Sequence, residues 1–96
     1  MKQPLSYINP NAKIAKSVVI DPFTSIDGDV VIGEGTCIGS NVSIMDGARI
    51  GKNCNIGNNS IIEKNVHIGD NCFIGSNSII RNSLIKNNVN ILDNCV

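Results

Sequence analysis

The sequence predicts an all-β fold, a single-stranded parallel β-helix with a triangular cross-section. Three observations indicate this fold. Isoleucine recurs at every sixth position over most of the chain, a small side chain stands two residues before most of these isoleucines, and glycine or asparagine stands close to them. A period of six cannot form one face of an α-helix, because successive residues would step about 240° around its axis. This period instead suits one short strand followed by one corner.

The isoleucines form the large inward column of the expected core. The chain has 17 isoleucines but only 3 aromatic residues, so the same stiff β-branched side chain fills equivalent space in every repeat. The members of the column are Ile8, Ile14, Ile20, Ile26, Ile32, Ile38, Ile44, Ile50, Ile56, Ile62, Ile68, Ile74, Ile80, Ile85 and Ile91.

A second inward column stands two residues before the isoleucines, where alanine, valine, threonine, serine or cysteine occurs. Residues two apart on a strand point to the same side, so each repeat contributes one strand with one large and one small inward side chain. The predicted strands span 12–14, 18–20, 24–26, 30–32, 36–38, 42–44, 48–50, 54–56, 60–62, 66–68, 72–74 and 78–80.

The corners between these strands carry residues that tolerate left-handed or otherwise tight backbone at low cost. Glycine follows the isoleucine at positions 33, 39, 51, 57, 69 and 75, and asparagine stands at 41, 53, 59, 65, 71, 77, 82, 88 and 94. Three sides close a coil of about 18 residues, so the chain makes about five coils and a prism about 25 Å long at the usual spacing between strands. We expect the stacked corner amides to hydrogen-bond to one another along the prism.

One step breaks the period. In the run IIRNSLI, which begins at Ile79, Ile85 follows Ile80 one position earlier than the period requires. We expect a tightened corner there, in which Arg81 replaces the usual glycine and one corner residue is missing. After this corner, Ile85 and Ile91 are again expected to point into the core.

Composition and charge exclude several classes of function. Eight basic and eight acidic residues give a net charge of 0, so electrostatics offers no case for binding nucleic acid or an anionic membrane. No apolar run reaches the length of a signal peptide or a membrane span. The sequence therefore predicts one cytoplasmic domain over residues 1–96, with residues 1–7 as a lead-in.

Few residues offer chemistry. His67 is the only histidine and therefore the only conventional general base, but it is a weak catalytic candidate because the sequence supplies no partner to orient it. It precedes an inward isoleucine, so we expect it on the outer surface. The glycines at 28, 33, 35 and 39 follow the corner spacing and precede no helix, so they predict neither a phosphate loop nor a bound cofactor.

The four cysteines lack the short paired spacing of a zinc site, so we expect no metal. Cys54 and Cys72 are one coil apart and share the small inward position. We interpret Cys54 and Cys72 as reduced thiols that pack as small core residues, which is the expected state in the cytoplasm.

The pattern I-G-x-N-x-x, seen in IGKNCN, IGNNSI, IGDNCF and IGSNSI, resembles the hexapeptide repeat of left-handed parallel β-helix proteins, most of which are acyl- or acetyltransferases. The left hand is what this resemblance implies, since the general rule for parallel crossovers favours the right hand. The resemblance also implies a homotrimer of prisms packed side by side.

Residues 1–56, with coils over 8–56, are similar to the first coils of the UDP-N-acetylglucosamine acyltransferase family of lipid A synthesis. An Ile-x-Pro near the start, the pair Pro22-Phe23 and the run IGEGT at 32–36 carry this resemblance. The chain departs from that family at Asn9, where histidine is common. The acidic substrate-binding loop and the catalytic histidine motif of the family have no match in the sequence.

Residues 57–96 instead resemble the early acetyltransferase-domain coils of the bifunctional uridyltransferase/acetyltransferase family that makes UDP-N-acetylglucosamine. The shortened step at 79–85 matches the form V-I-x-N-S-x-I that is typical there. The catalytic histidine and the sugar-binding arginine and lysine of that family have no counterpart. The simplest account is an engineered chimera or truncation of two hexapeptide proteins; a natural short member of the family is the alternative.

Outward apolar side chains suggest that the chain associates with itself. The candidates are the outward Ile61, Phe73, Ile79 and Leu84, together with Val96 at the end of the last coil. Side-by-side packing would give the trimer that the resemblance implies. End-to-end stacking at the C-terminal coil is the alternative, because an uncovered last strand would present unpaired backbone groups.

Two functions follow as hypotheses. The first is a structural, self-associating solenoid without a complete active site, so that the chain by itself is not an enzyme. The second is an acyl- or acetyltransferase that acts on a UDP-amino-sugar or sugar phosphate with an acyl thioester donor, with His67 as the base. A surface-binding solenoid is disfavoured, because Thr24 and Thr36 are expected to point inward.

Overall fold

The computed structural model describes residues 6–81 and 84–93, and within these ranges it contains strands and corners but no helix. This confirms the all-β solenoid of about five coils. Each strand consists of an inward isoleucine and the residue before it. The strands are β1 (Tyr7–Ile8), β2 (Lys13–Ile14), β3 (Val19–Ile20), β4 (Ser25–Ile26), β5 (Val31–Ile32), β6 (Cys37–Ile38), β7 (Ser43–Ile44), β8 (Arg49–Ile50), β9 (Asn55–Ile56), β10 (Ile61–Ile62), β11 (His67–Ile68), β12 (Phe73–Ile74), β13 (Ile79–Ile80), β14 (Leu84–Ile85) and β15 (Asn90–Ile91).

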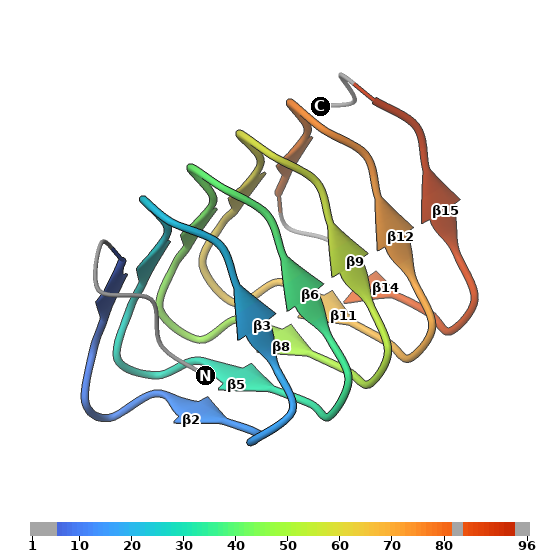
Figure 1. The fold of residues 1–96 in the computed structure, drawn as a ribbon. Coiled ribbons are helices and arrows are strands. Elements are labelled where there is room, and N and C mark those ends of the chain that lie inside the picture. The colour runs from blue at the N-terminus through green and yellow to red at the C-terminus, as the bar shows by residue number, and fades with distance from the viewer. Residues whose placement is uncertain (1–5, 82–83, 94–96) are drawn as a thin grey trace.

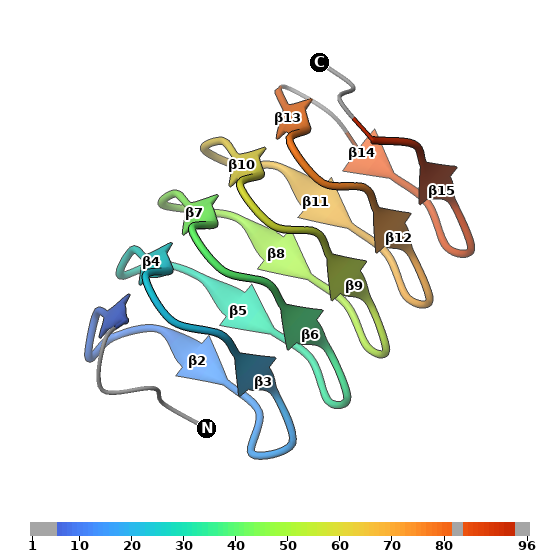
Figure 2. The ribbon, with the colours of Figure 1, turned by 45° about the horizontal axis from the view of Figure 1, so that its top comes forward.

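Every third strand joins the same parallel sheet, so the coil has three faces (Figures 1 and 2). Sheet A has the order β1-β4-β7-β10-β13, sheet B the order β2-β5-β8-β11-β14, and sheet C the order β3-β6-β9-β12-β15. Isoleucine pairs with isoleucine along each sheet, as Ile26 does with Ile44. The prism measures 29 × 21 × 20 Å.

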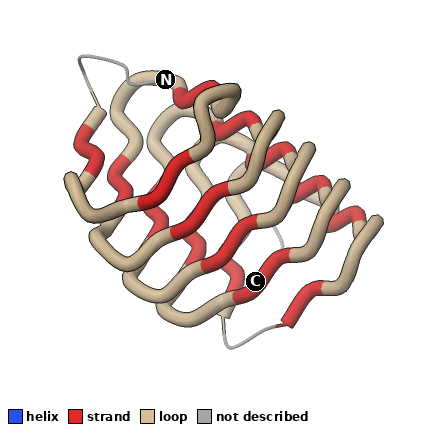
Figure 3. Tube along the Cα trace, turned by 90° about the horizontal axis from the view of Figure 1, so that it is seen from below, coloured by secondary structure: helices blue, strands red, loops and turns tan. Residues whose placement is uncertain are grey.

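Backbone hydrogen bonds join each coil to the next and explain why the strands are shorter than predicted. The Asn9 N–H donates to the Ile26 carbonyl at 2.9 Å, and the Ile61 N–H donates to the Ser78 carbonyl at 2.8 Å. The small inward residue, such as Ser78, thus still joins the ladder through its carbonyl, although the strand itself covers only the two residues after it. In Figure 3 these short strands alternate with long corners that carry the chain from face to face.

The core is a stack of isoleucines lined by the small inward residues. Isoleucines from Ile20 to Ile85 in the column are buried, whereas Ile8, Ile14 and Ile91 in the first and last described coils are partly buried. Among the small residues, Thr24, Thr36, Ser60 and Ser78 are buried and polar. Polar groups in such a place require partners.

The buried hydroxyls connect neighbouring coils. The Ser60 hydroxyl donates to the Gly75 carbonyl at 2.9 Å and accepts the Ser78 N–H at 3.3 Å. Thr36 repeats the pattern with the Gly51 carbonyl at 2.8 Å and the Cys54 N–H at 3.2 Å. No buried side-chain nitrogen or oxygen in the described residues lacks a partner. The small column therefore fills space and also ties neighbouring coils together.

Asparagine and glycine perform different tasks at the corners. Seven asparagines have positive φ, between 56° and 62°: Asn41, Asn53, Asn59, Asn65, Asn71, Asn77 and Asn88. Among the described glycines that directly follow the inward isoleucines, none has positive φ. A Cβ at Gly57 would instead lie 2.5 Å from the Ser76 backbone nitrogen. These glycines allow two coils to approach closely, and the asparagines turn the chain.

The expected bonding between stacked corner amides is wrong. The described left-handed asparagines do not bond to one another through their side chains; side-chain oxygens one residue earlier in the corner accept backbone N–H groups from the preceding coil. Asn58 Oδ1 accepts the Ser40 N–H at 2.8 Å, and Asp70 Oδ1 accepts the Lys52 N–H at 2.8 Å. The left-handed turn exposes these N–H groups along the prism, where a carboxylate serves as well as an amide.

Phe23 is an unusual corner residue, with φ of 66° and a side chain that is 62% exposed. The same corner in the following coils holds Asn41, Asn59 and Asn77. A bulky side chain in left-handed backbone is strained by about 1–2 kcal/mol, and asparagine relieves much of this strain.

Replacing Phe23 by asparagine should therefore raise the free energy of unfolding by about 1 kcal/mol. Urea unfolding followed by circular dichroism measures this change. Phe23→Ala is the control, because alanine also removes the ring but keeps a strained Cβ. If Phe23→Asn is no more stable than Phe23→Ala, backbone strain is not the cause.

The shortened step changes the spacing of the ladder. Before it, the Gly57 N–H donates to the Ile74 carbonyl; across it, the Gly69 N–H donates to the Ile85 carbonyl, which is one position nearer along the chain. Residues 82 and 83, in the expected tight corner, lie outside the described residues. Ile85 is buried and pairs with Ile68, so the inward phase continues after the step.

Candidate functional site

The outer surface of sheet B carries the strongest candidate site. Its outward side chains, one from each strand, are Lys13, Val31, Arg49, His67 and Leu84. His67 on β11 is in register with Arg49 on β8 and with Leu84 on β14. Paired strands lie about 4.8 Å apart, so the three side chains are neighbours along one line.

A shallow hollow of about 420 Å³ lies along this line. Arg49, His67, Leu84, Lys86 and Asn87 line it, together with the chain at residues 68, 69 and 85. Leu84 is 72% exposed and forms an apolar wall beside the imidazole. The volume is within the usual range of small-molecule sites, although the hollow is open to solvent.

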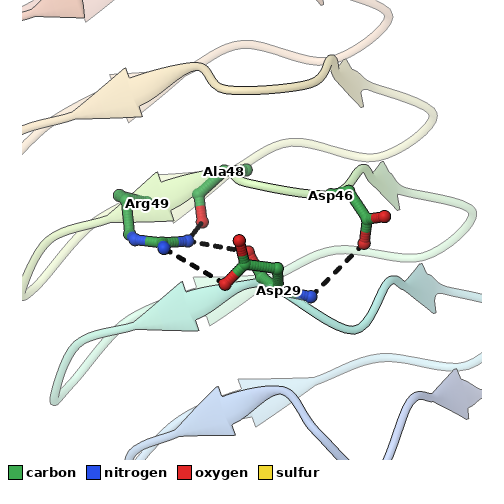
Figure 4. Close-up of polar contacts among 4 residues, drawn as sticks. All are labelled: Asp29, Asp46, Ala48 and Arg49. Carbon is green, nitrogen blue, oxygen red and sulfur yellow. Dashed lines mark hydrogen bonds and ion pairs between the residues drawn. The ribbon is translucent and has the colours of Figure 1, made fainter.

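The Arg49 guanidinium is held by hydrogen bonds to Asp29 and Ala48 (Figure 4). Its Nη1 donates to the Asp29 carbonyl at 2.7 Å and to the Ala48 carbonyl at 3.1 Å, and its Nη2 donates to Asp29 Oδ1 at 3.2 Å. The Asp29 N–H in turn donates to Asp46 Oδ1 at 3.3 Å. The Arg49–Asp29 ion pair is solvent-exposed, so it contributes at most about 1 kcal/mol to the free energy of unfolding. Its main effect is to fix the position of the Arg49 guanidinium.

His67 is exposed, as its position in the repeat predicts, and its neighbours on the sheet are a cation and an apolar side chain. A neutral imidazole there could accept a proton from a substrate in the hollow. Sequence reasoning identified His67 but missed Arg49 and Lys86. The signal for Arg49 was present, because it precedes His67 by one full coil and so occupies the same place on the sheet.

The cysteines that the structure describes are free thiols. Cys54 and Cys72 are buried, and their thiols donate to the Gly69 and Lys86 carbonyls, each at 3.1 Å. Burial raises the pKa of the Cys54 thiol above its usual value and outweighs the backbone hydrogen bond of Cys72, which lowers it. Cys54 therefore stays protonated and acts as a donor, as the serine and threonine hydroxyls do. Cys37 is exposed on sheet C, and Cys95 lies outside the described residues.

The remaining association candidates are spread over two other faces. Ile61 and Ile79 pair with each other on sheet A and are partly buried, whereas Phe73 is exposed on sheet C. Phe73 lies along a second hollow, of about 430 Å³, that Val19 and Cys37 also line. Val96 lies outside the described residues. The structure thus distributes the candidates over three surfaces.

Two searches of residues 6–81 and 84–93 gave negative results. No group of three histidine, cysteine or acidic side chains in these ranges is arranged to hold a metal ion. The same residues include no helix that is long and apolar enough to cross a membrane.

Comparisons with known families match the repeat. The family model described as bacterial transferase hexapeptide (six repeats) matches residues 11–46 and again 47–82. A model for the hexapeptide repeat of succinyl-transferase matches residues 29–64. These matches also support the left-handed coil that the resemblance implies. No curated protein sequence matches the chain.

Among solved structures, the chain is similar to the UDP-N-acetylglucosamine acyltransferase of Francisella novicida, with 29% identity and a TM-score of 0.68, covering 94% of this chain and 47% of that one. It also matches the acetyltransferase domain of PglB from Neisseria gonorrhoeae, with 18% identity and a TM-score of 0.42, over 94% of this chain and 52% of that one. A third match is perosamine N-acetyltransferase from Caulobacter crescentus, with 14% identity and a TM-score of 0.38, over 92% and 53%. The chain spans about half the length of these structures.

Proposed function

This chain belongs to the bacterial hexapeptide transferase family, and from that premise we propose that it forms the β-helical body of an acyl- or acetyltransferase. The proposed reaction transfers an acyl group from a thioester to a hydroxyl or amino group of a UDP-amino-sugar or sugar phosphate. Support comes from the family matches over residues 11–82 and from the similarity to a UDP-N-acetylglucosamine acyltransferase along 94% of the chain.

The observation that carries the proposal is the hollow on sheet B, where the sole imidazole of the sequence lies between Arg49 and Leu84. The His67 imidazole removes the proton from the attacking hydroxyl or amine, whose lone pair forms the new bond to the thioester carbonyl carbon. The carbon–sulfur bond then breaks, and the leaving thiolate receives the proton from the imidazolium. The exposed Leu84 side chain offers an apolar surface for the donor's acyl part.

The proposal includes association of prisms side by side, as a homotrimer. A neighbouring prism over sheet B would bury Leu84 and exclude water from the hollow, which strengthens electrostatic interactions with the reacting atoms. A cytoplasmic location also belongs to the proposal, since the described cysteines are free thiols and thioester donors are compatible with a reducing compartment.

A self-associating structural solenoid is the second candidate function. The observation that favours it is the uniform register of the described strands, which pair residue for residue from β1 to β13 without an inserted loop. In this case the exposed apolar side chains serve assembly, and the hollow on sheet B has no reaction to support. The two-parent origin, with a junction after residue 56, is part of this second proposal.

Acyl transfer by the purified chain tests the proposal. Acetyl coenzyme A and acyl carrier protein thioesters serve as donors and UDP-N-acetylglucosamine as acceptor. We expect turnover in the native chain and a loss of at least about 100-fold in kcat/KM for His67→Ala, the usual scale for a lost general base. Asn55→Ala, at an equivalent outward position on sheet C, should retain activity.

A native chain that transfers no acyl group from any of these donors would favour the structural solenoid. Turnover that survives His67→Ala would instead place the reaction elsewhere. Circular dichroism of both variants verifies that the coil is intact, and light scattering over a concentration series shows whether the active species is a trimer.

A further inference from the structure

The hollow on sheet B is lined by positive charges that have no role in the proposed proton transfer. Its charged lining residues, Arg49 and Lys86, are both cations, and no carboxylate of the described residues lines it. His67 lies beside Arg49 on the sheet. The chain as a whole has a net charge of 0, so this local excess of positive charge is a feature of the hollow.

Nearby carboxylates do not line the hollow, and each already accepts a hydrogen bond. Asp29 bonds to Arg49 from the preceding coil. Asp70 Oδ1 accepts the Lys52 N–H at 2.8 Å, and Glu63 Oε2 accepts from Arg81 Nε at 3.2 Å. Lys86 forms no ion pair with any described residue. Its charge is therefore less compensated than that of Arg49.

The hollow also offers uncharged and charged N–H donors. Asn87 Oδ1 accepts the Asp70 N–H at 2.7 Å, which leaves the Asn87 amide NH₂ group as a donor. Three of the five N–H groups of Arg49 are used by Asp29 and Ala48, which leaves Nε–H and one Nη2–H. A guanidinium, an ammonium and an amide with free N–H groups suit a ligand with several acceptor oxygens and negative charge.

We propose that this hollow binds a phosphoryl group, through Lys86, Arg49 and the Asn87 amide. The inference rests on the proposed function and deepens it. It assigns the hollow to the phosphate-bearing part of a reactant. Both a UDP-sugar and the coenzyme of a thioester donor carry such a group.

The His67 ring provides a direct probe of binding, because it is the only imidazole in the chain and gives a single set of NMR signals. Inorganic pyrophosphate is titrated at fixed pH and fixed ionic strength, with chloride as the compensating anion. We expect the His67 ring signals to move and to saturate. Parallel titrations with UDP-N-acetylglucosamine and with coenzyme A show which reactant supplies the phosphate, since the tighter ligand is the one whose phosphate the hollow holds.

Lys86→Gln should weaken pyrophosphate binding at least about 5-fold, because a charge-assisted contact between a cation and a phosphate is lost. Arg49→Gln should weaken it similarly. Lys64→Gln is the matched control, because Lys64 is an exposed corner lysine that does not line the hollow, and it should leave the dissociation constant unchanged.

A linear, non-saturating response, or the same dissociation constant in native chain and Lys86→Gln, would overturn the site. The outcome is separable from the transfer reaction. Saturable, Lys86-dependent binding without turnover would support the phosphoryl site and contradict the proposed acyl transfer. Turnover without such binding would support acyl transfer and contradict the phosphoryl site.

Discussion

Replacing Ile44 by alanine should lower the free energy of unfolding by about 4 kcal/mol. Ile44 is 1% exposed and lies on β7 in the middle of sheet A, in register between Ile26 and Ile62. Truncation removes buried apolar area and leaves a cavity whose cost depends on how far the surroundings collapse. Collapse is limited here, because backbone bonds to both neighbouring coils fix the height of each isoleucine in the stack.

Urea unfolding followed by far-ultraviolet circular dichroism measures the effect. Ile44→Val is the graded control and should cost about 1 kcal/mol, since it removes one methylene group at the same place. Ser43→Ala, on the same strand but pointing outward, should change stability by less than about 0.5 kcal/mol. An Ile44→Ala cost close to that of Ser43→Ala would show that the isoleucine stack is not the main source of stability.

The fold was accessible from sequence because one packing problem recurs in every coil. A residue such as Ile44 has the same environment as Ile26 and Ile62, so a spacing of six reports burial directly. The same regularity predicts which residues face outward, which placed His67 on the surface. The hand of the coil is different: it came from the resemblance and the family matches, because strand pairing and burial are the same for either hand.

Side-chain contacts between coils and local backbone strain could not be predicted from the repeat. Arg49 and Asp29 lie on successive coils, and nothing in the repeat shows that the arginine side chain bends toward the preceding coil instead of toward His67. Phe23 has left-handed backbone at a corner where the later coils have asparagine. Because phenylalanine rarely adopts this conformation, residue propensity alone does not predict left-handed backbone at position 23. Side-chain reach and local strain decide these features, and neither follows the period of six.

The origin of the two halves stays a prediction. A family match runs across the junction after residue 56, and β9 pairs with β6 and with β12 in the same register. A natural solenoid and an engineered fusion joined in register would both show this pairing. Because each coil contacts only its neighbours, coils from different parents are compatible wherever the corners match. Continuity of the fold therefore does not separate the two origins.

Replacing Gly57 by alanine should lower the free energy of unfolding by about 3 kcal/mol, although the added group is a single methyl. A Cβ at Gly57 would lie 2.5 Å from the Ser76 nitrogen, 2.7 Å from the Gly75 carbonyl carbon and 2.8 Å from the Ser76 Cα. All three are backbone atoms, so no side-chain rotation relieves the clash. Relief requires the two coils to separate, which stretches the 2.7 Å bond from the Gly57 N–H to the Ile74 carbonyl.

Gly28→Ala is the matched control for this prediction. A Cβ at Gly28 would meet only side-chain atoms of Asn9, the nearest at 3.2 Å, and Gly28 does not have positive φ. Alanine there should be neutral within about 0.5 kcal/mol or slightly stabilising, because it reduces the freedom of the unfolded chain. Equal unfolding midpoints for the two variants would mean that the coils can separate at little cost. A large difference between them would show that the glycine column sets the distance between coils, a role that conformational freedom alone does not explain.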